Sequence, residues 1–446
     1  MITQRYGDLE IGFTTDYRFL AEDLPFLGDA MFWAPKMDGW WPLGCYFSPR
    51  QIDPRGRCGA MVLRSVPGSD LLAPPTGYTR IMTAERLGHR LSFWRPNPPA
   101  GYVALGDLCT SGDHVPPLEE VMCVKKTHQG RDYVRRAEVA RHPIWRPGFA
   151  GTVYGDFSAW AIEAPLYPDA DTEEHLFVPA GVFTAVPSRE RPSPTETTWV
   201  LDLPAIIEKG PGLELPRLHS HAEPPSQTTI VTDRTVTVPY FMVTDDGRDE
   251  KWKVNNSPFY KIQRKRHYEL ILFRNNQQGS EPQPDSEAIT TGVSREQGES
   301  FSVRTGISVS ATVGVEASAK PFGIGASASA STTVSASVEL GYERRYGITT
   351  MESKTVTRSL VTPPKCSGAL WMERHELLPI RANGDMISSD SKLPFRTVYY
   401  HTGQYPQARA AGERVVYAEL DENGQPLPYQ IGIPVQDTEP QEDVID

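Results

Sequence analysis

The most regular pattern of apolar and polar positions in the chain lies between Phe301 and Tyr342. From Phe301 to Ala319, nine of the ten odd-numbered positions are apolar and none of the ten even-numbered positions is. The phase then reverses, and from Ala326 to Tyr342 all but one of the even-numbered positions are apolar. Because directly opposed residues of antiparallel strands share a face, a turn between Ala319 and Ala326 places both apolar rows on one side. The pattern predicts an amphipathic β-hairpin over residues 301–342.

The two predicted arms are unusually long. They run 19 and 17 residues, whereas strands in globular proteins mostly have about 3–10 residues and a tilted strand crosses the core of a bilayer in about 9–11. A lone hairpin has two unpaired edges, which are costly in lipid. Several chains would therefore each supply one hairpin to a closed transmembrane barrel. A long hairpin in a soluble sandwich and a Ser/Ala-rich linker are the alternatives for the same pattern.

If the hairpin is part of a barrel, its apolar row and its polar row face different environments. The apolar row faces lipid and includes Val303, Ile307, Val309, Val313, Val315, Val334, Val338 and Leu340. The polar row faces a wet lumen and includes Arg304, Ser308, Ser310, Glu316, Ser335 and Glu339. The turn exposes two large apolar side chains, which suits contact with a membrane. We expect the membrane-insertion tip to consist of Pro321, Phe322, Gly323 and Ile324.

A weaker pattern recurs three times between residues 30 and 187. Each copy joins an apolar residue, Trp, any residue and Pro to a later aromatic residue and Gly, and the copies start at Phe32, Phe93 and Ile144. The repeated Trp residues are Trp33, Trp94 and Trp145. Their spacing suits a unit of three or four strands used three times, with the Trp rings around a shared axis. The repeat predicts a pseudo-three-fold β-prism.

Pro, Gly and β-branched residues are spread along the whole chain, which favours many short strands separated by turns. We place the β-prism at residues 1–190. Frequent Pro and charged residues predict a linker over 191–225. Further strand patterns surround the predicted hairpin, so residues 226–446 form a second β-domain. The whole chain is therefore expected to be all-β.

Charge and cysteine usage limit the partners of the chain. Its 45 basic and 56 acidic residues leave a net charge of -11, which repels a phosphate backbone, so nucleic acid is not an expected partner. The N-terminus shows no export signal, and no stretch has 18 consecutive apolar residues. We expect a soluble protein that is secreted or released without an evident signal peptide. An odd number of Cys without a CxxC pair favours free thiols at Cys45, Cys58, Cys109, Cys123 and Cys366.

Catalytic and metal-binding motifs are missing from the sequence. There is no GxSxG, P-loop or HExxH pattern, and the stretch His375-Glu376-Leu377-Leu378-Pro379 lacks the second His. His219 and His221 lie two residues apart without a third ligand nearby. We therefore expect no enzyme activity, no cofactor and no metal.

Two charged segments carry weaker hypotheses. Residues 261–267 contain a dense basic run that would attract lipid head groups or a neighbouring protomer, unless it is only a solvated strand face. The run comprises Lys261, Arg264, Lys265, Arg266 and His267. The last ten residues are acidic and are expected to act as a removable guard or to be disordered. Cleavage near Arg409 or Arg414 would release them.

The predicted hairpin and its Thr-rich flanks resemble the pore-forming region of aerolysin-type β-pore-forming toxins, including epsilon toxin and mosquitocidal toxin relatives. This resemblance covers about residues 226–440. It implies a soluble monomer that forms a ring-shaped prepore and then a transmembrane barrel. The repeats, with DLLAPPTGY (Asp70–Tyr78) and LFVPAGVFTAV (Leu176–Val186), resemble the vacuolar protein sorting "sixty-two" family of β-prisms over about residues 25–190. The first copy departs from the pattern, because two Trp residues stand where Gly and Tyr are expected.

By this resemblance the prism holds a toxin on a cell-surface receptor, often a glycan or glycoprotein. Aromatic residues beside turns are the candidates for that contact, and packing within the repeat explains them equally well. They are Trp40, Trp41, Tyr102 and Tyr154.

We therefore expect an insecticidal pore-forming toxin that forms a homo-oligomer on the target-cell membrane. The main alternative is a carbohydrate- or lipid-binding β-prism protein that causes no lysis. An enzyme acting on glycans and a structural adhesin are weaker alternatives. For the enzyme, the necessary paired carboxylates cannot be located from the sequence.

Overall fold

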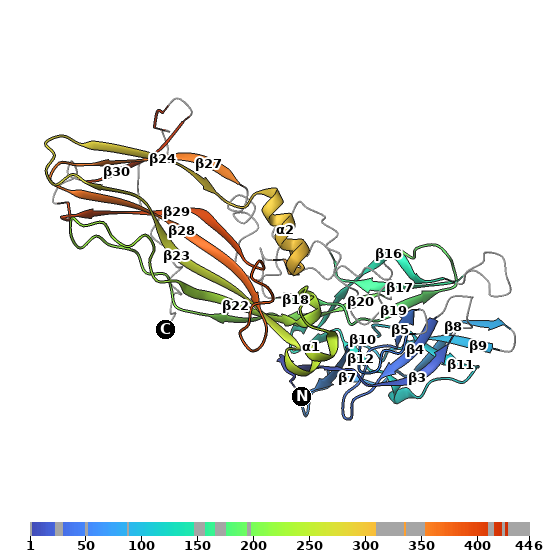
Figure 1. Ribbon diagram of the computed structural model, residues 1–446. Coiled ribbons are helices and arrows are strands. Elements are labelled where there is room, and N and C mark those ends of the chain that lie inside the picture. Colours follow the sequence, from blue (N-terminus) through green and yellow to red (C-terminus); the bar gives the residue numbers. More distant parts are fainter. Residues whose placement is uncertain are drawn as a thin grey trace.

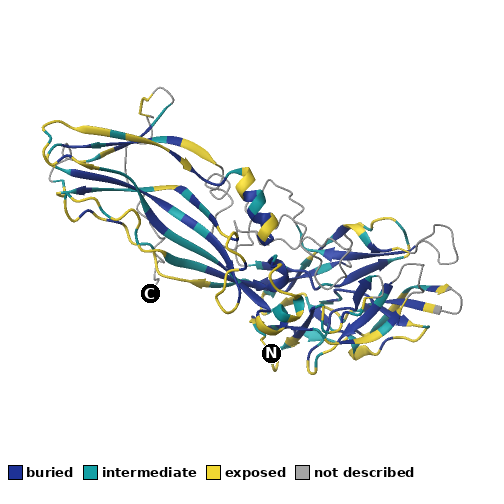
Figure 2. Cartoon of the chain, in the orientation of Figure 1, coloured by how far each residue is buried: buried dark blue, intermediate teal, exposed yellow. Residues whose placement is uncertain are grey.

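The chain folds into an elongated molecule made almost entirely of β-strands (Figure 1). This computed structural model describes residues 2–22, 30–49, 52–86, 89–146, 157–165, 175–193, 198–308, 334–335, 353–408, 414–421 and 424–426. A module of short strands lies at one end, and a long twisted sheet extends away from it (Figure 1). Buried residues gather in the first module and along the middle of the long sheet (Figure 2). The predicted all-β fold class is confirmed.

Six three-stranded sheets build the N-terminal module in its described part, and they fall into two sets of three. The first set comprises β3 (Tyr17–Glu22), β4 (Ala30–Pro35) and β5 (Tyr46–Pro49); β8 (Gly77–Arg86), β9 (His89–Asn97) and β11 (Leu108–Ser111); and β16 (Glu138–Trp145), β17 (Ser158–Glu163) and β19 (Phe183–Val186). The second comprises β1 (Gln4–Tyr6), β2 (Leu9–Thr14) and β6 (Ala60–Ser65); β7 (Leu72–Ala73), β10 (Tyr102–Val103) and β12 (Cys123–Lys125); and β15 (Val134–Arg136), β18 (His175–Val178) and β20 (Trp199–Pro204). The hairpin β13 (Thr127–His128) and β14 (Arg131–Asp132) and the 3-10 turn η1 (Leu118–Glu120) complete the module. This arrangement agrees with the predicted pseudo-three-fold prism.

An aromatic cluster lies where the three sheets of the first set meet. The ring centroids of Phe32, Phe93 and Trp145 are 5.3 to 5.8 Å apart. The expectation that all three repeated Trp rings surround this axis is wrong, because Trp33 packs in a separate cluster. Neighbouring residues of a strand point to opposite faces, so the residue before Trp occupies the axis in the first two copies. In the third copy, a register shift between Pro143 and Trp145 accompanies the inward placement of Trp145.

The glycines of the repeated Leu-Gly pairs let the chain pack closely against Val182. A Cβ atom on Gly106 would lie 2.5 Å from the Cβ atom of Val182, and one on Gly44 would lie 2.9 Å from a Val182 methyl carbon. These distances are shorter than any side chain tolerates. Glycine is therefore required at both positions by packing rather than by backbone conformation.

Two sheets form the second module. The larger one is built in the order β21 (Ile206–Lys209), β22 (Val231–Pro239), β23 (Phe259–Asn275), β28 (Ser367–Ile380) and β29 (Leu393–Tyr405). The smaller one is built in the order β24 (Gln283–Thr291), β27 (Lys354–Thr362) and β30 (Val416–Leu420). The remaining elements are η2 (Tyr240–Met242), α1 (Glu250–Asn256), α2 (Arg295–Thr305), β25 (Ile307–Ser308) and β26 (Val334–Ser335).

The segment assigned from its composition to a linker, residues 191–225, is largely part of the two modules. Strand β20 completes a sheet of the prism, and β21 directly after it starts the long sheet. Further along, Leu218 is buried in a cluster with Tyr268 and Trp371. Proline removes backbone donors, but it does not prevent the intervening apolar side chains from packing on a neighbouring sheet. Composition alone therefore misjudged this segment.

One continuous hydrophobic core joins the prism to the long module. At the junction, the ring of Phe13 lies 5.2 Å from that of Tyr240 and 5.6 Å from that of Phe259. Gly59 donates its backbone N–H to Glu250 Oε2 at 2.7 Å, and a Cβ atom there would collide with the Tyr240 hydroxyl. Shared aromatic packing of this kind favours one fixed arrangement of the two modules.

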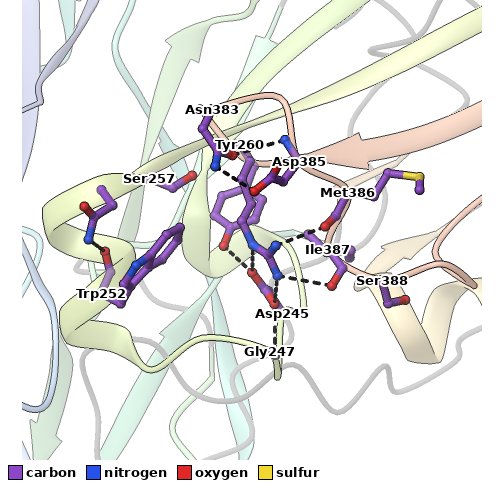
Figure 3. Close-up of polar contacts among 12 residues, drawn as sticks. Asp245, Gly247, Trp252, Ser257, Tyr260, Asn383, Asp385, Met386, Ile387 and Ser388 are labelled. Atoms are coloured by element: carbon purple, nitrogen blue, oxygen red, sulfur yellow. Dashed lines mark hydrogen bonds and ion pairs between the residues drawn. The ribbon is translucent and has the colours of Figure 1, made fainter.

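A buried ion pair fixes the end of β28 near this junction. Arg381 donates from Nε and Nη2 to the two oxygens of Asp245 at 2.8 and 2.9 Å, and it also donates to the carbonyls of Met386 and Ile387. Figure 3 shows the Tyr260 hydroxyl directed at the same carboxylate, to which it donates at 2.6 Å. Burial alone would raise the pKa of Asp245, but the bonds from Arg381 and Tyr260 lower it. The carboxylate is thus ionised and fully satisfied.

Replacing Arg381→Met is expected to lower the free energy of unfolding by about 3–5 kcal/mol, because Asp245 remains buried without its cation. Urea unfolding followed by Trp fluorescence measures this change. The matched control is Arg55→Met, which removes an exposed pair with Asp53 and should leave the unfolding midpoint near that of the wild type. Equal midpoints for the two variants would contradict a structural role for the buried pair.

Candidate functional site

Strands β24 and β27 border the segment that contains the predicted hairpin. They pair antiparallel along their whole length without a bulge, from Gln283 opposite Thr362 to Thr291 opposite Lys354. The chain therefore leaves β24 and re-enters β27 at the same end of this sheet (Figure 1). Two adjacent strands of this kind form the base from which a hairpin can extend.

The buried positions of these two strands have the same phase as the apolar rows of residues 301–342. In β24, the buried residues Ile289 and Thr291 have odd numbers. In β27, four of the five buried residues have even numbers, namely Val356, Arg358, Leu360 and Thr362, and Ser359 is the exception. The apolar positions of the predicted hairpin are also odd before its turn and even after it. Both strands thus carry the periodicity of the hairpin arm that each one adjoins.

The first residues of the predicted hairpin are helical, so the strand expected from Phe301 is wrong for residues 301–305. Helix α2 begins with a capping box, in which Ser294 Oγ accepts from the Gln297 backbone N–H at 3.2 Å and Gln297 Oε1 accepts from that of Ser294 at 3.1 Å. It ends at Gly306, whose φ of 73° is the left-handed conformation common after helices. These local caps, together with the burial of Phe301, outweigh the alternating pattern.

Two predicted site residues lie on α2. Val303, expected to face lipid, is 60% exposed. Arg304, expected to face a lumen, donates from Nη1 to the carbonyl of Asp390 at 3.2 Å. The helix also contains Gly298 and Thr305, which are weak helix formers. The stability of α2 therefore depends on its caps and on the burial of one side more than on the intrinsic helix propensity of its residues.

Beyond α2, the described strands β25 and β26 pair in parallel, with Ile307 opposite Val334 and Ser308 opposite Ser335. The predicted antiparallel hairpin places Ile307 opposite Val338 instead, so this pairing differs from the prediction. The remaining hairpin residues named above lie outside the described residues. They are Val309, Ser310, Val313, Val315, Glu316, Pro321, Phe322, Gly323, Ile324, Val338, Glu339 and Leu340.

The basic run at residues 261–267 is part of an ion-pair network on the long sheet. Arg264 donates to Asp233 at 2.9 and 2.6 Å, and Arg266 donates to Asp233 at 2.9 Å and to Glu373 at 2.6 Å. Asp233 sits at a register shift of β22, which adds an extra residue opposite β23. The hypothesis of an exposed basic patch for lipid head groups is wrong for these two arginines, because nearby carboxylates neutralise them.

The centre of this network is a buried carboxylate beside a histidine. Burial disfavours the charge on Glu373, but hydrogen bonds and charges from His375 and Arg266 lower its pKa to about 2. Burial in turn lowers the pKa of His375, against the opposing effect of Glu373. At neutral pH the network therefore holds an ionised Glu373 and a cationic Arg266.

The aromatic residues proposed to contact a receptor have unequal exposure. Trp40 is only 6% exposed and lies under the Arg64 guanidinium, 4.6 Å from it, so it has little surface for a ligand. Trp41 is half-buried, and its backbone pairs with that of Leu63. Tyr102 is half-buried and donates its hydroxyl to the carbonyl of Asp70. Tyr154 lies outside the described residues.

The prism also contains a cavity next to Tyr102 that no pattern in the sequence predicts. Its lining includes Arg136 and Trp199, which are direct partners across β15 and β20. The two residues are far apart in the sequence, and neither belongs to the repeated motif. A pattern search along the chain therefore has no signal that joins them.

The structure also bears on the cysteines, on membrane-spanning helices and on the C-terminal residues. All five cysteines are free thiols, as predicted. Within the described ranges, no helix has the length and apolar character needed to cross a bilayer. The acidic last ten residues and Arg409 lie outside the described residues, while Arg414 lies just before β30.

Two family models match different parts of the chain. Residues 231–362 match the family described as Insecticidal Crystal Toxin, P42, and residues 28–139 match Vacuolar protein sorting-associated protein 62. The second match confirms the resemblance over residues 28–139, which contain the first two of the three repeat copies. The first match extends from β22 to β27, so it includes the strands that border the predicted hairpin.

Two solved structures show a remote similarity to this chain. GNIP1Aa from Chromobacterium piscinae shares 18% identity with a TM-score of 0.33, over 43% of this chain, which spans only 37% of that protein. Cry35Ab1 shares 10% identity with a TM-score of 0.35, over 91% of each chain. No curated protein matches the chain significantly. The family match therefore shows that the second module contains a segment similar to insecticidal crystal toxins.

Proposed function

We propose that the chain is a pore-forming toxin that acts on insect cells. It is released as a soluble protein, and the prism binds a glycan or glycoprotein receptor on the target-cell membrane. The second module then forms a homo-oligomer, and each chain contributes residues 301–342 to an aerolysin-like transmembrane β-barrel. No bond is made or broken, so the proposal includes no enzyme activity and no cofactor.

The register of β24 and β27 is the observation that most strongly supports this proposal. If the pairing continued without a bulge beyond Thr291 and Lys354, Ala319 would lie opposite Ala326. The turn would then centre on Phe322 and Gly323. The alternation of apolar residues predicts the same turn independently. The hairpin can therefore form by extension of an existing ladder, with no change in register.

Helix α2 must unfold for this extension to occur. Its residues from Phe301 onward alternate in the phase of β24, and extension would convert them from helix to strand. This conversion breaks the hydrogen bonds of the capping box and exposes Phe301, which is only 2% exposed in the described structure. A buried Phe side chain contributes about 1.5–3 kcal/mol, so contacts with lipid and with neighbouring protomers have to offset a loss of this size.

Crosslinks test the proposed change of register. Ser308 pairs with Ser335 in the described structure, whereas the extended hairpin places it opposite Ser337. Neighbouring strands are about 4.8 Å apart, and a disulfide spans Cα separations of about 4.4–6.8 Å. We expect Ser308→Cys with Ser335→Cys to crosslink in solution and to abolish vesicle leakage until a reductant is added. Ser308→Cys with Ser337→Cys should crosslink mainly on receptor-bearing membranes.

Both crosslinking variants need a background in which the two partly exposed native thiols, Cys58 and Cys366, are changed to Ser. Ser308→Cys alone is the matched control and should leak like this background. The proposal fails if the oxidised pair at 308 and 335 causes full leakage without reductant. It also fails if the pair at 308 and 337 never crosslinks on membranes that leak.

Bilayer conductance tests which row of the hairpin faces lipid. The planar bilayer is made from target-cell lipids that carry the receptor. Val309→Arg with Val313→Arg places two charges on the proposed lipid face, each of which costs about 2–4 kcal/mol near the bilayer centre. We expect the discrete current steps of the wild type to disappear. The matched control, Ser310→Arg with Thr312→Arg, puts the same charges at nearly the same depth on the lumen face and should retain steps with altered ion selectivity. Equal behaviour of the two double variants would exclude the hairpin as the pore wall.

A further inference from the structure

Residues 211–225 form an irregular segment, the strap, that packs on one face of the long sheet. The strap contains four prolines and no helix or strand. Backbone hydrogen bonds fix the chain at both of its ends, because Gly210 donates to the Asp233 carbonyl and Leu270 donates to the Ser226 carbonyl, both at 2.8 Å. Proline-rich segments stay extended without a hydrogen-bonded ladder. Side-chain contacts therefore hold the middle of the strap on the sheet.

The strap covers an aromatic strip that runs over three strands, with Tyr268 on β23, Trp371 on β28 and Tyr405 on β29. Leu218 of the strap is buried in the same cluster, and Trp371 is only 1% exposed. Gly403 of β29 provides the space, because a Cβ atom there would lie 2.6 Å from the Trp371 ring and 3.8 Å from Leu218 Cγ. Release of the strap would therefore expose aromatic surface to water.

A histidine lies where the strap meets the aromatic strip. The ring of His401 on β29 stacks on that of Trp371, with the centroids 6.2 Å apart and the planes at 25°, and it lies 6.4 Å from the ring of Tyr268. The same imidazole donates a hydrogen bond to the backbone carbonyl of Pro216 in the strap. A group that titrates near neutral pH thus contacts both the strap and the surface beneath it.

The surroundings of His401 disfavour a positive charge on its ring. Burial lowers the pKa of His401, the hydrogen bond to Pro216 partly opposes this effect, and the nearby cation of Arg217 lowers the pKa further. The groups that face the imidazole are Arg217 of the strap, Trp371 of β28 and Tyr268 of β23. Because the pKa is lower with the strap in place, a released strap binds more protons. The strap is therefore held above pH 6.5, the ordinary pKa of histidine, and is destabilised as the pH falls below it.

The end of the strap that precedes β22 has a separate anchor. The Nδ1 atom of His221 lies 3.1 Å from Ser367 Oγ, and its ring packs edge-on against that of Tyr405 at 5.0 Å. The backbone carbonyl of His221 also accepts from Asn275 Nδ2 at 2.8 Å. These contacts do not involve His401, so loss of the His401 contact frees the strap first around Leu218.

We propose that the strap and His401 form an acid-sensitive latch on the long sheet. Protonation of the imidazole places a second cation beside Arg217 within the aromatic contact, and the strap then leaves the sheet around Leu218. Its release exposes the aromatic strip on the module to which the proposed function assigns oligomer formation. The latch goes beyond that function, because it uses none of the hairpin or prism residues on which the proposed function rests.

Thiol labelling of the full chain measures release of the strap. Leu218→Cys, in the background with Cys58→Ser and Cys366→Ser, reports the buried contact. Ser220→Cys in the same background gives the rate of an accessible thiol at each pH, because this position of the strap is exposed. The ratio of the two rates with an aromatic disulfide reagent is the protection of position 218. If uptake of one proton drives release, the protection falls by up to about tenfold per pH unit below pH 6.5.

Substitutions assign this fall to His401. His401→Phe keeps an aromatic ring against Trp371 but cannot take up a proton, so the protection should stay constant between about pH 8 and about pH 5. The matched control is His142→Gln, which removes an exposed histidine of the prism and should leave the fall unchanged. Constant protection in the protein that retains His401 would overturn the latch, and so would an equal fall in His401→Phe.

Fluorescence provides a second readout, because Leu218→Cys itself weakens the packing of the strap. The difference in emission between the wild type and Trp371→Phe isolates Trp371, and we expect it to shift to the red below pH 6.5 as this ring meets water. The same difference measured in the His401→Phe background should not shift. An unshifted wild-type difference would contradict the latch, and so would a loss of the circular dichroism of the strands over the same pH range.

Both readouts report contact between the strap and the sheet in the soluble chain, and neither depends on leakage. Failure of the latch therefore leaves the pore proposal intact. Failure of the hairpin variants to change conductance likewise leaves the latch intact.

Discussion

The antiparallel pairing of β24 with β27 is the constraint on which the functional interpretation depends. Each strand is joined to one end of the long intervening segment, and their register determines how any extension of the ladder must align. A slip of one residue would turn every side chain of an arm to the opposite face. The ladder ends at Thr291 and Lys354 in the structure, where the helical caps of α2 replace strand pairing. The same segment thus combines a strand periodicity with a helical start.

The prism and the long sheet depend on each other through a common core. Phe13 of the prism packs with Tyr240 and Phe259 of the second module, and Gly59 admits the close approach of the Tyr240 hydroxyl. The buried pair of Asp245 and Arg381 secures the loop after β28 close to this contact. Because the aromatic contact is buried, separating the modules would expose aromatic surface, which is costly.

Each module contains a buried carboxylate that is satisfied by hydrogen bonds. Asp107 is bound by Arg95 and a backbone N–H, and Glu373 is bound by Arg266 and His375. The bonds from Ala185 to Asp107 and from Arg266 to Glu373 connect segments that are distant in the sequence. Acidic residues thus neutralise basic ones locally, and the basic run at residues 261–267 becomes part of an internal ion-pair network.

The sequence by itself determined the features that depend on local periodicity. Alternation from Phe301 to Tyr342 indicates strand-forming arms and a turn at Phe322, and the three repeats indicate a three-fold prism, because strand faces and repeats are encoded by residue spacing. Tertiary structure decided which of these preferences prevail. It placed Phe32 and Phe93 on the prism axis instead of their Trp neighbours, kept residues 301–305 helical, and joined Arg136 to Trp199 in one cavity. The prism axis and the cavity depend on contacts between residues far apart in the chain, which spacing along one strand does not record, and the helix depends on its caps together with the burial of Phe301.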